Sequence, residues 1–158
     1  ATTEATLTQV LAAGGLDDDF MHFWPPLVRA ALAAGDVARA ERLLKPVTSA
    51  LPGVVSPAVR AHLRHLQGLI EATRGDDPTL AEEDLRSGVA ALADFGAAGW
   101  SARAEEDLAR WLLGQGRPRD AEPHLRNARA VYEAIGATGW LRRLDSERAA
   151  AWSATSAT

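Results

Sequence analysis

The 158-residue sequence has no cysteine, which excludes disulfides and zinc sites built on thiolates. It also has no apolar run of transmembrane length, and its first residues lack the charged-then-apolar layout of a secretory signal. Lys45 is the only lysine among 17 basic residues, a bias that is typical of a GC-rich coding sequence. We therefore expect a chain without covalent crosslinks or membrane spans, located in the cytoplasm.

Excess positive charge is lacking as well. The net charge is −4 and the isoelectric point is near 5.5, which argues against direct nucleic-acid binding because phosphate neutralisation needs a concentrated basic surface. The length suits one domain with a continuous core. Because the chain starts at Ala1 without methionine and ends in an Ala/Ser/Thr tail, we interpret it as a segment of a longer protein.

One six-residue motif, which we call the repeated phrase, occurs in two similar copies forty residues apart: Phe95-Gly96-Ala97-Ala98-Gly99-Trp100 and Ile135-Gly136-Ala137-Thr138-Gly139-Trp140. Self-similarity at a period of this size is typical of stacked repeats, in which each unit is too small to bury its apolar face alone. The function of such an array lies on the surface that stacking creates. The repeat therefore favours binding over catalysis.

Apolar residues recur at helical spacing through most of the chain, and glycine or proline interrupts them. The clearest case follows Ser56 and Pro57, an N-cap and a first-turn proline, where apolar residues recur at i, i+4, i+7 and i+11 from Val59. We predict an all-α fold of three helix hairpins and a terminal helix, with units at about 17–54, 56–96, 98–136 and 139–152.

The N-terminal part gives weaker signals. A short helix is predicted over Thr6 to Ala13, and Asp17 to Asp19 suit the cap of the next helix. Phe20, Phe23 and Trp24 together suggest an exposed apolar patch on which preceding repeats would pack.

The helix-turn pattern resembles the tetratricopeptide repeat, which has a glycine turn followed by a small residue in the second helix. The matching residues are Gly35, Asp36 and Ala40, then Gly75 and Ala81, then Gly116 and Ala121, with Gly68 at the small position of a first helix. The resemblance implies a right-handed solenoid of antiparallel hairpins. The period is near forty residues rather than thirty-four, so the match is to a divergent branch.

A narrower resemblance covers about Ala81 to Leu144. The Gly-Ala-x-Gly-Trp junction, the Gly-Arg-x-x-Asp-Ala segment and the Tyr-Glu-Ala-Ile-Gly-Ala ending look like the C-terminal repeat regions of large bacterial signal-transduction ATPases and transcriptional regulators. That resemblance implies a sensor segment joined to an effector module. The chain has no Gly-x-x-x-x-Gly-Lys-Ser/Thr phosphate loop, so it is not the ATPase part.

In tetratricopeptide arrays the first helix of each pair lines a concave groove, and the resemblance carries this role onto particular positions here. They are His22 and Arg29, then His62, His65, Leu69 and Thr73, then Arg103, Glu106 and Arg110. This groove is mildly basic. Arginine forks pair with carboxylates, which predicts an acidic peptide or the acidic face of a partner domain as the ligand. For each arginine the alternative is a solvated side chain or a pair with a nearby carboxylate, as for Arg103 with Asp107.

The histidine and acidic residues that could bind a metal or take part in catalysis also have structural explanations. His62 and His65 lie on one helix face but lack a third metal ligand, so a solvated or groove-lining pair is favoured over a metal site. The acidic triplets at 82–84 and 105–107 are interpreted as first-turn residues that suit the helix dipole. No nucleophile, base and orienting group can be assembled, so we predict no enzyme, no cofactor and no metal.

Trp100 and Trp140 recur with the repeat and are predicted to pack in the core, at the junctions between hairpins. Two other functions stay open. One is a small-molecule effector pocket lined by Trp111, His62 and His65, and the other is a structural spacer or a homodimerisation element. A groove predicts convergent arginines, whereas an effector pocket predicts an enclosed apolar cavity with few polar groups.

Overall fold

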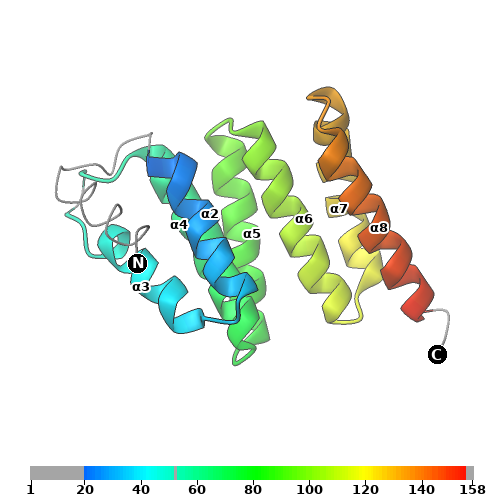
Figure 1. Cartoon of the computed structure of the whole chain (residues 1–158), viewed down its shortest axis with the longest axis horizontal. Helices are drawn as coiled ribbons and strands as arrows, with labels where there is room; N and C mark the ends of the chain where they lie inside the picture. The colour runs from blue at the N-terminus through cyan, green and yellow to red at the C-terminus, as the bar shows by residue number, and fades with distance from the viewer. Residues whose placement is uncertain (1–19, 52, 156–158) are drawn as a thin grey trace. The chain divides into compact units, whose positions relative to one another are not determined.

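The computed structural model describes residues 20–51 and 53–155, and the side chains of these except at 21 and 147–155 (Figure 1). All regular structure in these ranges is helical, which confirms the predicted all-α class. The chain divides into two compact units, Ala1–Ala91 (unit 1) and Leu92–Thr158 (unit 2). The helices are α2 (Phe20–Ala33), α3 (Val37–Thr48), α4 (Pro57–Arg74), α5 (Pro78–Asp94), α6 (Ala98–Gly114), α7 (Pro118–Ala134) and α8 (Thr138–Thr155).

The predicted helix starts and stops agree with the structure to within a few residues. Ser56 caps α4 by accepting a hydrogen bond from the Val59 amide at 3.3 Å, and Pro57 is the first helical residue. Asp36 caps α3 by accepting from the Arg39 amide at 2.9 Å. The predictions for 6–13 and for the cap at 17–19 lie outside the described residues.

The repeated phrase folds into the same turn twice. Gly96 and Gly136 have φ of 82° and 68°, in the left-handed region that favours glycine. After each glycine, the next amide donates to a carbonyl five residues earlier: Ala97 to Leu92 at 3.2 Å, and Ala137 to Tyr132 at 2.8 Å. This is the Schellman ending of a helix, and it makes room for the next helix to begin one residue later.

In unit 1, α2, α3 and α4 pack against one another around an aromatic centre. Trp24 is fully buried, and its indole N–H donates to the Leu43 carbonyl of α3 at 2.7 Å. Phe20 is also fully buried and stacks on Trp24, with ring centroids 5.2 Å apart. The predicted exposed patch at Phe20, Phe23 and Trp24 is therefore wrong: two of the rings belong to the core and Phe23 is half-buried against it.

Two glycines bring the backbones of α4 and α5 together. A Cβ on Gly68 would lie 2.6 Å from the Leu85 nitrogen, and one on Gly88 would lie 2.5 Å from the Cα of His65. Neither distance is physically available to a side-chain carbon, because each clash is with main chain that cannot swing aside. The small residue predicted at Gly68 therefore has a packing role, and Gly88 has the matching role on α5.

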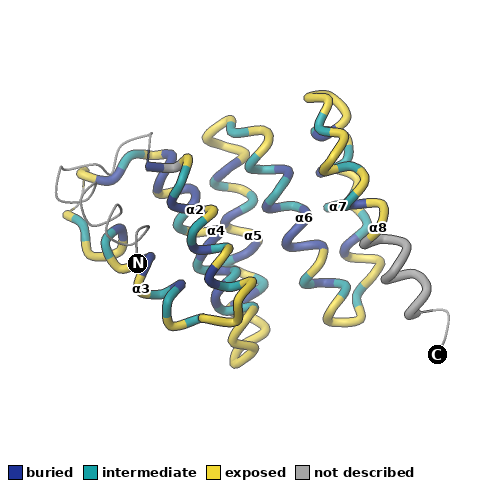
Figure 2. Tube along the Cα trace, viewed as in Figure 1, coloured by how far each residue is buried: buried dark blue, intermediate teal, exposed yellow. Residues whose placement is uncertain are grey.

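In unit 2, α7 packs against both α6 and α8. Figure 2 shows buried stretches along α6 within unit 2. Small residues, Ala102 of α6 and Ala128 of α7, are buried with Tyr132 and with Leu144 of α8. The core of unit 2 therefore holds a phenol, whose polar end needs a partner.

Candidate functional site

The predicted site residues of unit 1 differ in exposure. Arg29 on α2 is half-buried, whereas His62 and His65 on α4 are each 1% exposed. The interpretation of the histidines as a solvated or groove-lining pair is therefore wrong. The close approach of α5 at Gly88, next to His65, accounts for part of this burial, and nothing in the sequence of α4 alone signals it.

Burial changes the chemistry of His62. The pKa of His62 is lowered from 6.5 to about 4, mainly by burial and also by the nearby His65, Arg29 and His22. The imidazole is consequently neutral at physiological pH. A neutral, buried histidine contributes packing and hydrogen bonding, and it adds no positive charge to a groove.

The acidic residues of unit 2 are placed differently from the prediction. Because α6 begins at Ala98, the triplet at 105–107 lies in the middle of the helix and not in its first turn. Glu106 and Asp107 are buried, with Glu106 1% exposed. The helix-dipole interpretation of this triplet is wrong, and two buried carboxylates require partners instead.

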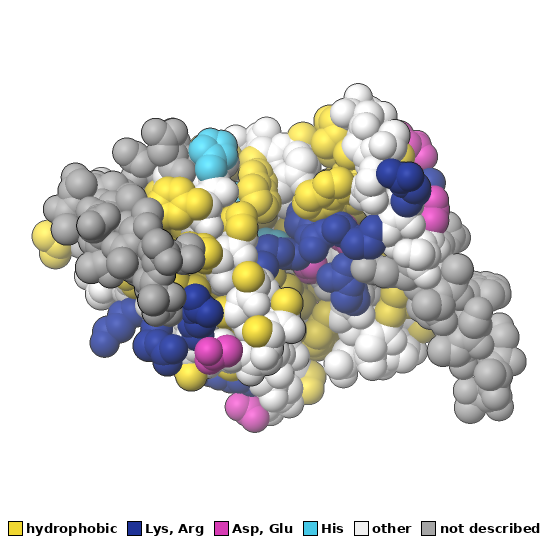
Figure 3. Space-filling model, viewed as in Figure 1, with side chains coloured by type: hydrophobic (Ala, Val, Ile, Leu, Met, Phe, Trp, Pro, Cys, Tyr) yellow, Lys and Arg dark blue, Asp and Glu magenta, His cyan; other side chains and the backbone are white. Residues whose placement is uncertain are grey.

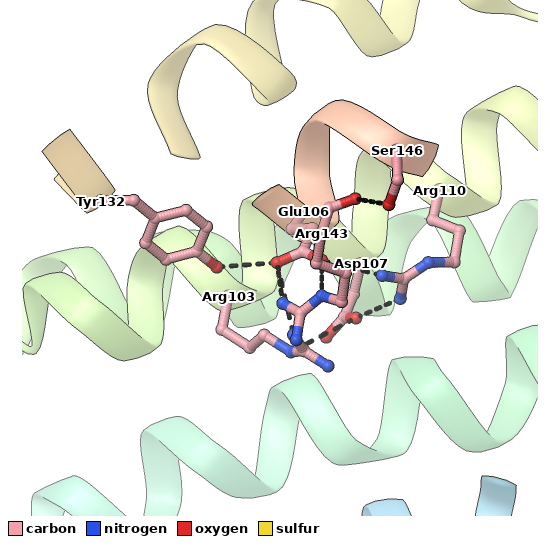
Figure 4. A network of polar contacts seen from close by, with 7 residues as sticks. All are labelled: Arg103, Glu106, Asp107, Arg110, Tyr132, Arg143 and Ser146. Carbon is pink, nitrogen blue, oxygen red and sulfur yellow. Dashed lines mark hydrogen bonds and ion pairs between the residues drawn. The ribbon is translucent and has the colours of Figure 1, made fainter. Parts of the chain in front are cut away.

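Those partners come from three helices (Figure 4). From α8, Arg143 binds the Glu106 carboxylate in a bidentate manner, donating from Nε to Oε1 at 3.0 Å and from Nη2 to Oε2 at 2.7 Å. From α7, the Tyr132 hydroxyl donates to Oε2 at 2.8 Å. Glu106 therefore ties α6 to both neighbouring helices of unit 2.

Two arginines of α6 complete what we call the Glu106 cluster. Arg110 donates from Nη2 to Glu106 and from Nη1 to Asp107, both at 2.9 Å. Arg103 donates more weakly to Glu106, at 3.4 Å, and its Nε lies 4.0 Å from Asp107. The expected pairing of Arg103 with Asp107 is thus present, as one edge of a larger network.

Burial and the surrounding donors act in opposite directions on the pKa of Glu106. The pKa of Glu106 is raised, because burial, with a smaller contribution from Asp107, outweighs the Tyr132 hydroxyl, Arg103 and Arg110, which lower it. All the groups hydrogen-bonded to its two oxygens are donors, which is the pattern of an ionised carboxylate. Burial also raises the pKa of Tyr132, so its hydroxyl stays protonated and acts as a donor.

The outer side of the cluster is cationic. Arg110 and Arg143 are 45% and 35% exposed, whereas Arg103 is 15% exposed. Three guanidinium groups face two carboxylates, so the cluster carries one excess positive charge. Figure 3 shows Lys and Arg side chains gathered over α6, with acidic side chains partly visible beneath them.

Trp140 of α8 extends the cluster toward an apolar surface. The guanidinium carbons of Arg103 and Arg143 lie 4.8 and 4.7 Å from the centre of its ring, within cation–π range. Its ring centroid is 5.3 Å from that of Tyr132. The arginines are thus held both by carboxylates and by an aromatic face.

An apolar cavity of about 270 Å³ opens beside these rings. Its walls come from the start of α6, the end of α7 and the start of α8, and they are Gly99, Trp100, Tyr132, Ile135, Ala137 and Trp140. The predicted packing of the two repeated tryptophans inside the core is wrong, because Trp140 is 38% exposed and Trp100 is half-buried. The two copies of the phrase meet across this cavity.

Unit 1 has a cavity of different character, about 460 Å³, between α3 and α4. Its walls carry both signs of charge, including Arg42 and Lys45 on one side and Glu71 on the other. Arg74 crosses it to pair with Glu41 and also donates to Glu71 at 2.6 Å. Arg74, Glu41 and Glu71 are thus engaged with one another within the unit.

Sequence reasoning found part of the Glu106 cluster and missed the rest. Arg103, Glu106 and Arg110 were predicted together as groove positions implied by the tetratricopeptide resemblance, and they share one face of α6 at spacings of three and four. Arg143 and Tyr132 were not predicted, since they lie 37 and 26 residues from Glu106. The one available signal was Tyr132, a single tyrosine within a sequence that places apolar residues at its core positions.

The effector pocket predicted from Trp111, His62 and His65 is not assembled in either of these cavities, whose walls are other residues. Among the described residues, no three histidine or acidic side chains gather closely enough to hold a metal ion. In the same part of the chain, no helix combines the length and the apolar character needed to cross a membrane.

Comparison of the chain with protein families, with curated proteins and with solved structures finds no significant match.

Proposed function

We propose that this chain is a protein-binding module, and that unit 2 binds an acidic segment of its partner. The observation that carries the proposal is the Glu106 cluster, in which buried carboxylates hold Arg110 and Arg143 at the surface. An arginine that is already ordered loses less side-chain entropy when it binds. Such preorganised guanidinium groups suit carboxylate ligands, which accept their paired N–H groups.

Binding is favoured over catalysis by the state of the buried acid. Glu106 accepts hydrogen bonds from four side chains, so its oxygens are occupied by donors of its own unit. A general acid or base instead needs an open position toward a substrate proton. The cluster is therefore suited to holding a surface in place, and we propose no enzymatic activity and no cofactor.

The wider setting is also proposed. The Schellman turn, which recurs at Gly35, Gly96, Gly116 and Gly136, and the forty-residue period support a tetratricopeptide-like array of helix hairpins, in the manner of the sensor regions of large bacterial signal-transduction regulators. In such a regulator, a partner that prefers one conformation of the array shifts its population, and the shift reaches the attached effector module. The acidic partner is a protein or peptide, or another domain of the same chain.

The test uses a fluorescein-labelled, capped peptide made only of Asp and Glu, titrated with the protein at low and at physiological salt. The variant is Arg110→Gln. Its matched control is Arg117→Gln, because Arg117 is similarly exposed and also pairs with an aspartate three residues away, Asp120, at 2.7 Å. Both variants lose one positive charge, so only position differs between them.

We expect Arg110→Gln to weaken peptide binding about threefold at low salt, with less effect at physiological salt, as for an exposed ion pair. Arg117→Gln should bind like the wild type. Equal losses in the two variants would mean that total charge alone attracts the peptide, and no binding by the wild type would refute the proposal.

A further inference from the structure

Two aromatic rings belong to both the Glu106 cluster and the apolar cavity of unit 2. Tyr132 lines the cavity with its ring and donates its hydroxyl to Glu106. Trp140 lines the cavity and lies under the guanidinium groups of Arg103 and Arg143. The charged surface and the apolar cavity are therefore adjacent parts of one site.

The size of the cavity limits what it can hold. At about 270 Å³ it lies below the roughly 300–1,000 Å³ of ordinary small-molecule sites. Such sites also place several polar groups around their ligand, whereas the lining here is almost wholly apolar. The cavity thus suits a single large apolar side chain better than a whole effector molecule.

Ile135 at the rim of this cavity is 57% exposed, and Trp140 is 38% exposed. Large apolar side chains exposed together beside a polar rim are typical of interaction surfaces. Arginine and tryptophan are also the residue types that most often dominate binding energy at interfaces.

From this arrangement we infer that the cavity of Trp100, Ile135 and Trp140 takes one large apolar side chain, such as leucine, from the acidic segment that binds the arginines. The occupant is then a peptide with carboxylates on either side of an apolar anchor. This inference rests on the proposed function, because the charge complementarity that selects an acidic segment comes from the Glu106 cluster. It adds the specificity that charge alone lacks.

The test compares two capped, labelled peptides that differ at one position: alternating Asp and Glu with a central Leu, and the same peptide with a central Ser. We expect the Leu peptide to bind wild-type protein about tenfold more tightly, the effect of burying one such side chain. Binding of the Leu peptide should also shift the indole N–H resonances of Trp100 and Trp140, assigned with Trp→Phe variants.

The repeated phrase supplies a matched pair of variants that leave charge unchanged. A Cβ on Gly99 would lie 3.9 Å from Cδ1 of Ile135, an ordinary van der Waals contact, so the side chain of Gly99→Leu starts at a wall of the cavity. Gly139 holds the equivalent position in the second copy, and a Cβ there meets nothing within 4 Å. Neither glycine has a positive φ, so leucine fits the backbone at both positions.

Gly99→Leu should reduce binding of the Leu peptide to the level of the Ser peptide, whereas Gly139→Leu should leave the tenfold preference intact. Thermal unfolding followed by circular dichroism confirms that both variants are folded. If the two peptides bind wild-type protein equally and Arg110→Gln still weakens both, the proposed function stands and the cavity inference is wrong.

Other results separate the remaining occupants. If concentrated wild-type protein forms a dimer in light scattering and Gly99→Leu abolishes it, the cavity holds a second copy of the chain, and the inference is overturned. If the Leu peptide binds tightly but Gly99→Leu has no effect, the anchor lies elsewhere, with the same consequence. Failure of both peptides to bind refutes the proposed function together with the inference.

Discussion

At the scale of single residues, His62 makes stability depend on pH. Its pKa is lowered from 6.5 to about 4 in the folded chain, mainly by burial and then by His65, Arg29 and His22. Between about pH 4 and pH 6.5, His62 is protonated in the unfolded chain and neutral in the folded chain. The contribution of neutral His62 is therefore fully present above about pH 6.5 and is lost as the pH falls toward 4.

We expect this loss to reach about 3 kcal/mol in the free energy of unfolding, from the size of the pKa difference. Urea unfolding at a series of pH values measures it, and His62→Gln should remove most of this pH dependence. If the variant is too unstable to unfold cooperatively, NMR titration of the His62 ring in wild-type protein decides the matter. A midpoint near 6.5 would contradict the prediction.

Glu106 is the second buried ionisable residue whose replacement should lower the free energy of unfolding measurably. Replacing it by glutamine leaves Arg103, Arg110 and Arg143 around a neutral amide, and breaking a buried charge pair costs about 3 kcal/mol or more. Tyr132→Phe removes one hydrogen bond to a charged acceptor and should cost about 2 kcal/mol.

The control for the Glu106 prediction is Glu133→Gln on α7. Glu133 is exposed, and its pair with Arg129 at 3.4 Å is worth less than about 1 kcal/mol. In urea unfolding, Glu106→Gln should lose the most stability, Tyr132→Phe less, and Glu133→Gln the least. Equal stability of Glu106→Gln and Glu133→Gln would show that the cluster contributes little to the fold.

At the scale of helices, the close contact of α4 with α5 depends on two missing side chains. Gly68→Ala and Gly88→Ala each place a carbon within 2.6 Å of the facing main chain. Overpacking of this kind costs about 1–3 kcal/mol, which exceeds the gain of about 1 kcal/mol that alanine brings to a helix. We expect each variant to be destabilised by about 1–2 kcal/mol, measured by thermal unfolding.

Gly114→Ala on α6 is the matched control, because a Cβ there meets nothing within 4 Å and the backbone φ is not positive. It should be neutral or slightly stabilising. If all three alanine variants behave alike, the α4–α5 contact tolerates a methyl group and the geometric argument fails.

At the scale of the whole molecule, the net charge of −4 opposes the positive charge of one cluster. Screening at physiological salt limits electrostatic interactions to about 8 Å, so a short acidic peptide senses mainly the nearest arginines. A long polyanion also meets the acidic remainder of the surface. We expect fluorescence anisotropy to detect no binding of a labelled DNA duplex at physiological salt, under conditions where the acidic Leu peptide binds.

Duplex binding that weakens steeply with salt would contradict this prediction, because it would reveal a concentrated basic surface. Arg110→Gln would then locate that surface, since a contact with phosphate reduces the salt dependence when it is removed. The Arg117→Gln protein serves as the control of equal charge.

The helix boundaries could be predicted because they depend on interactions within a few residues of sequence. The helix boundaries at Ser56, Gly96 and Gly136 follow from caps and turns formed within a few residues, and the sequence by itself determined them together with the all-α class. Such signals operate over one turn of chain. They are readable without knowledge of what packs on the helix.

Burial was decided only by tertiary structure. His62 and Glu106 look like surface residues in the sequence of their own helices, and they are buried because distant chain covers them or bonds to them, as Arg143 does to Glu106. Trp140, expected in the core, remains partly exposed beside a cavity. Contacts between residues far apart in sequence leave no periodic signal, so the sequence marks the helices while packing selects which of their side chains form a site.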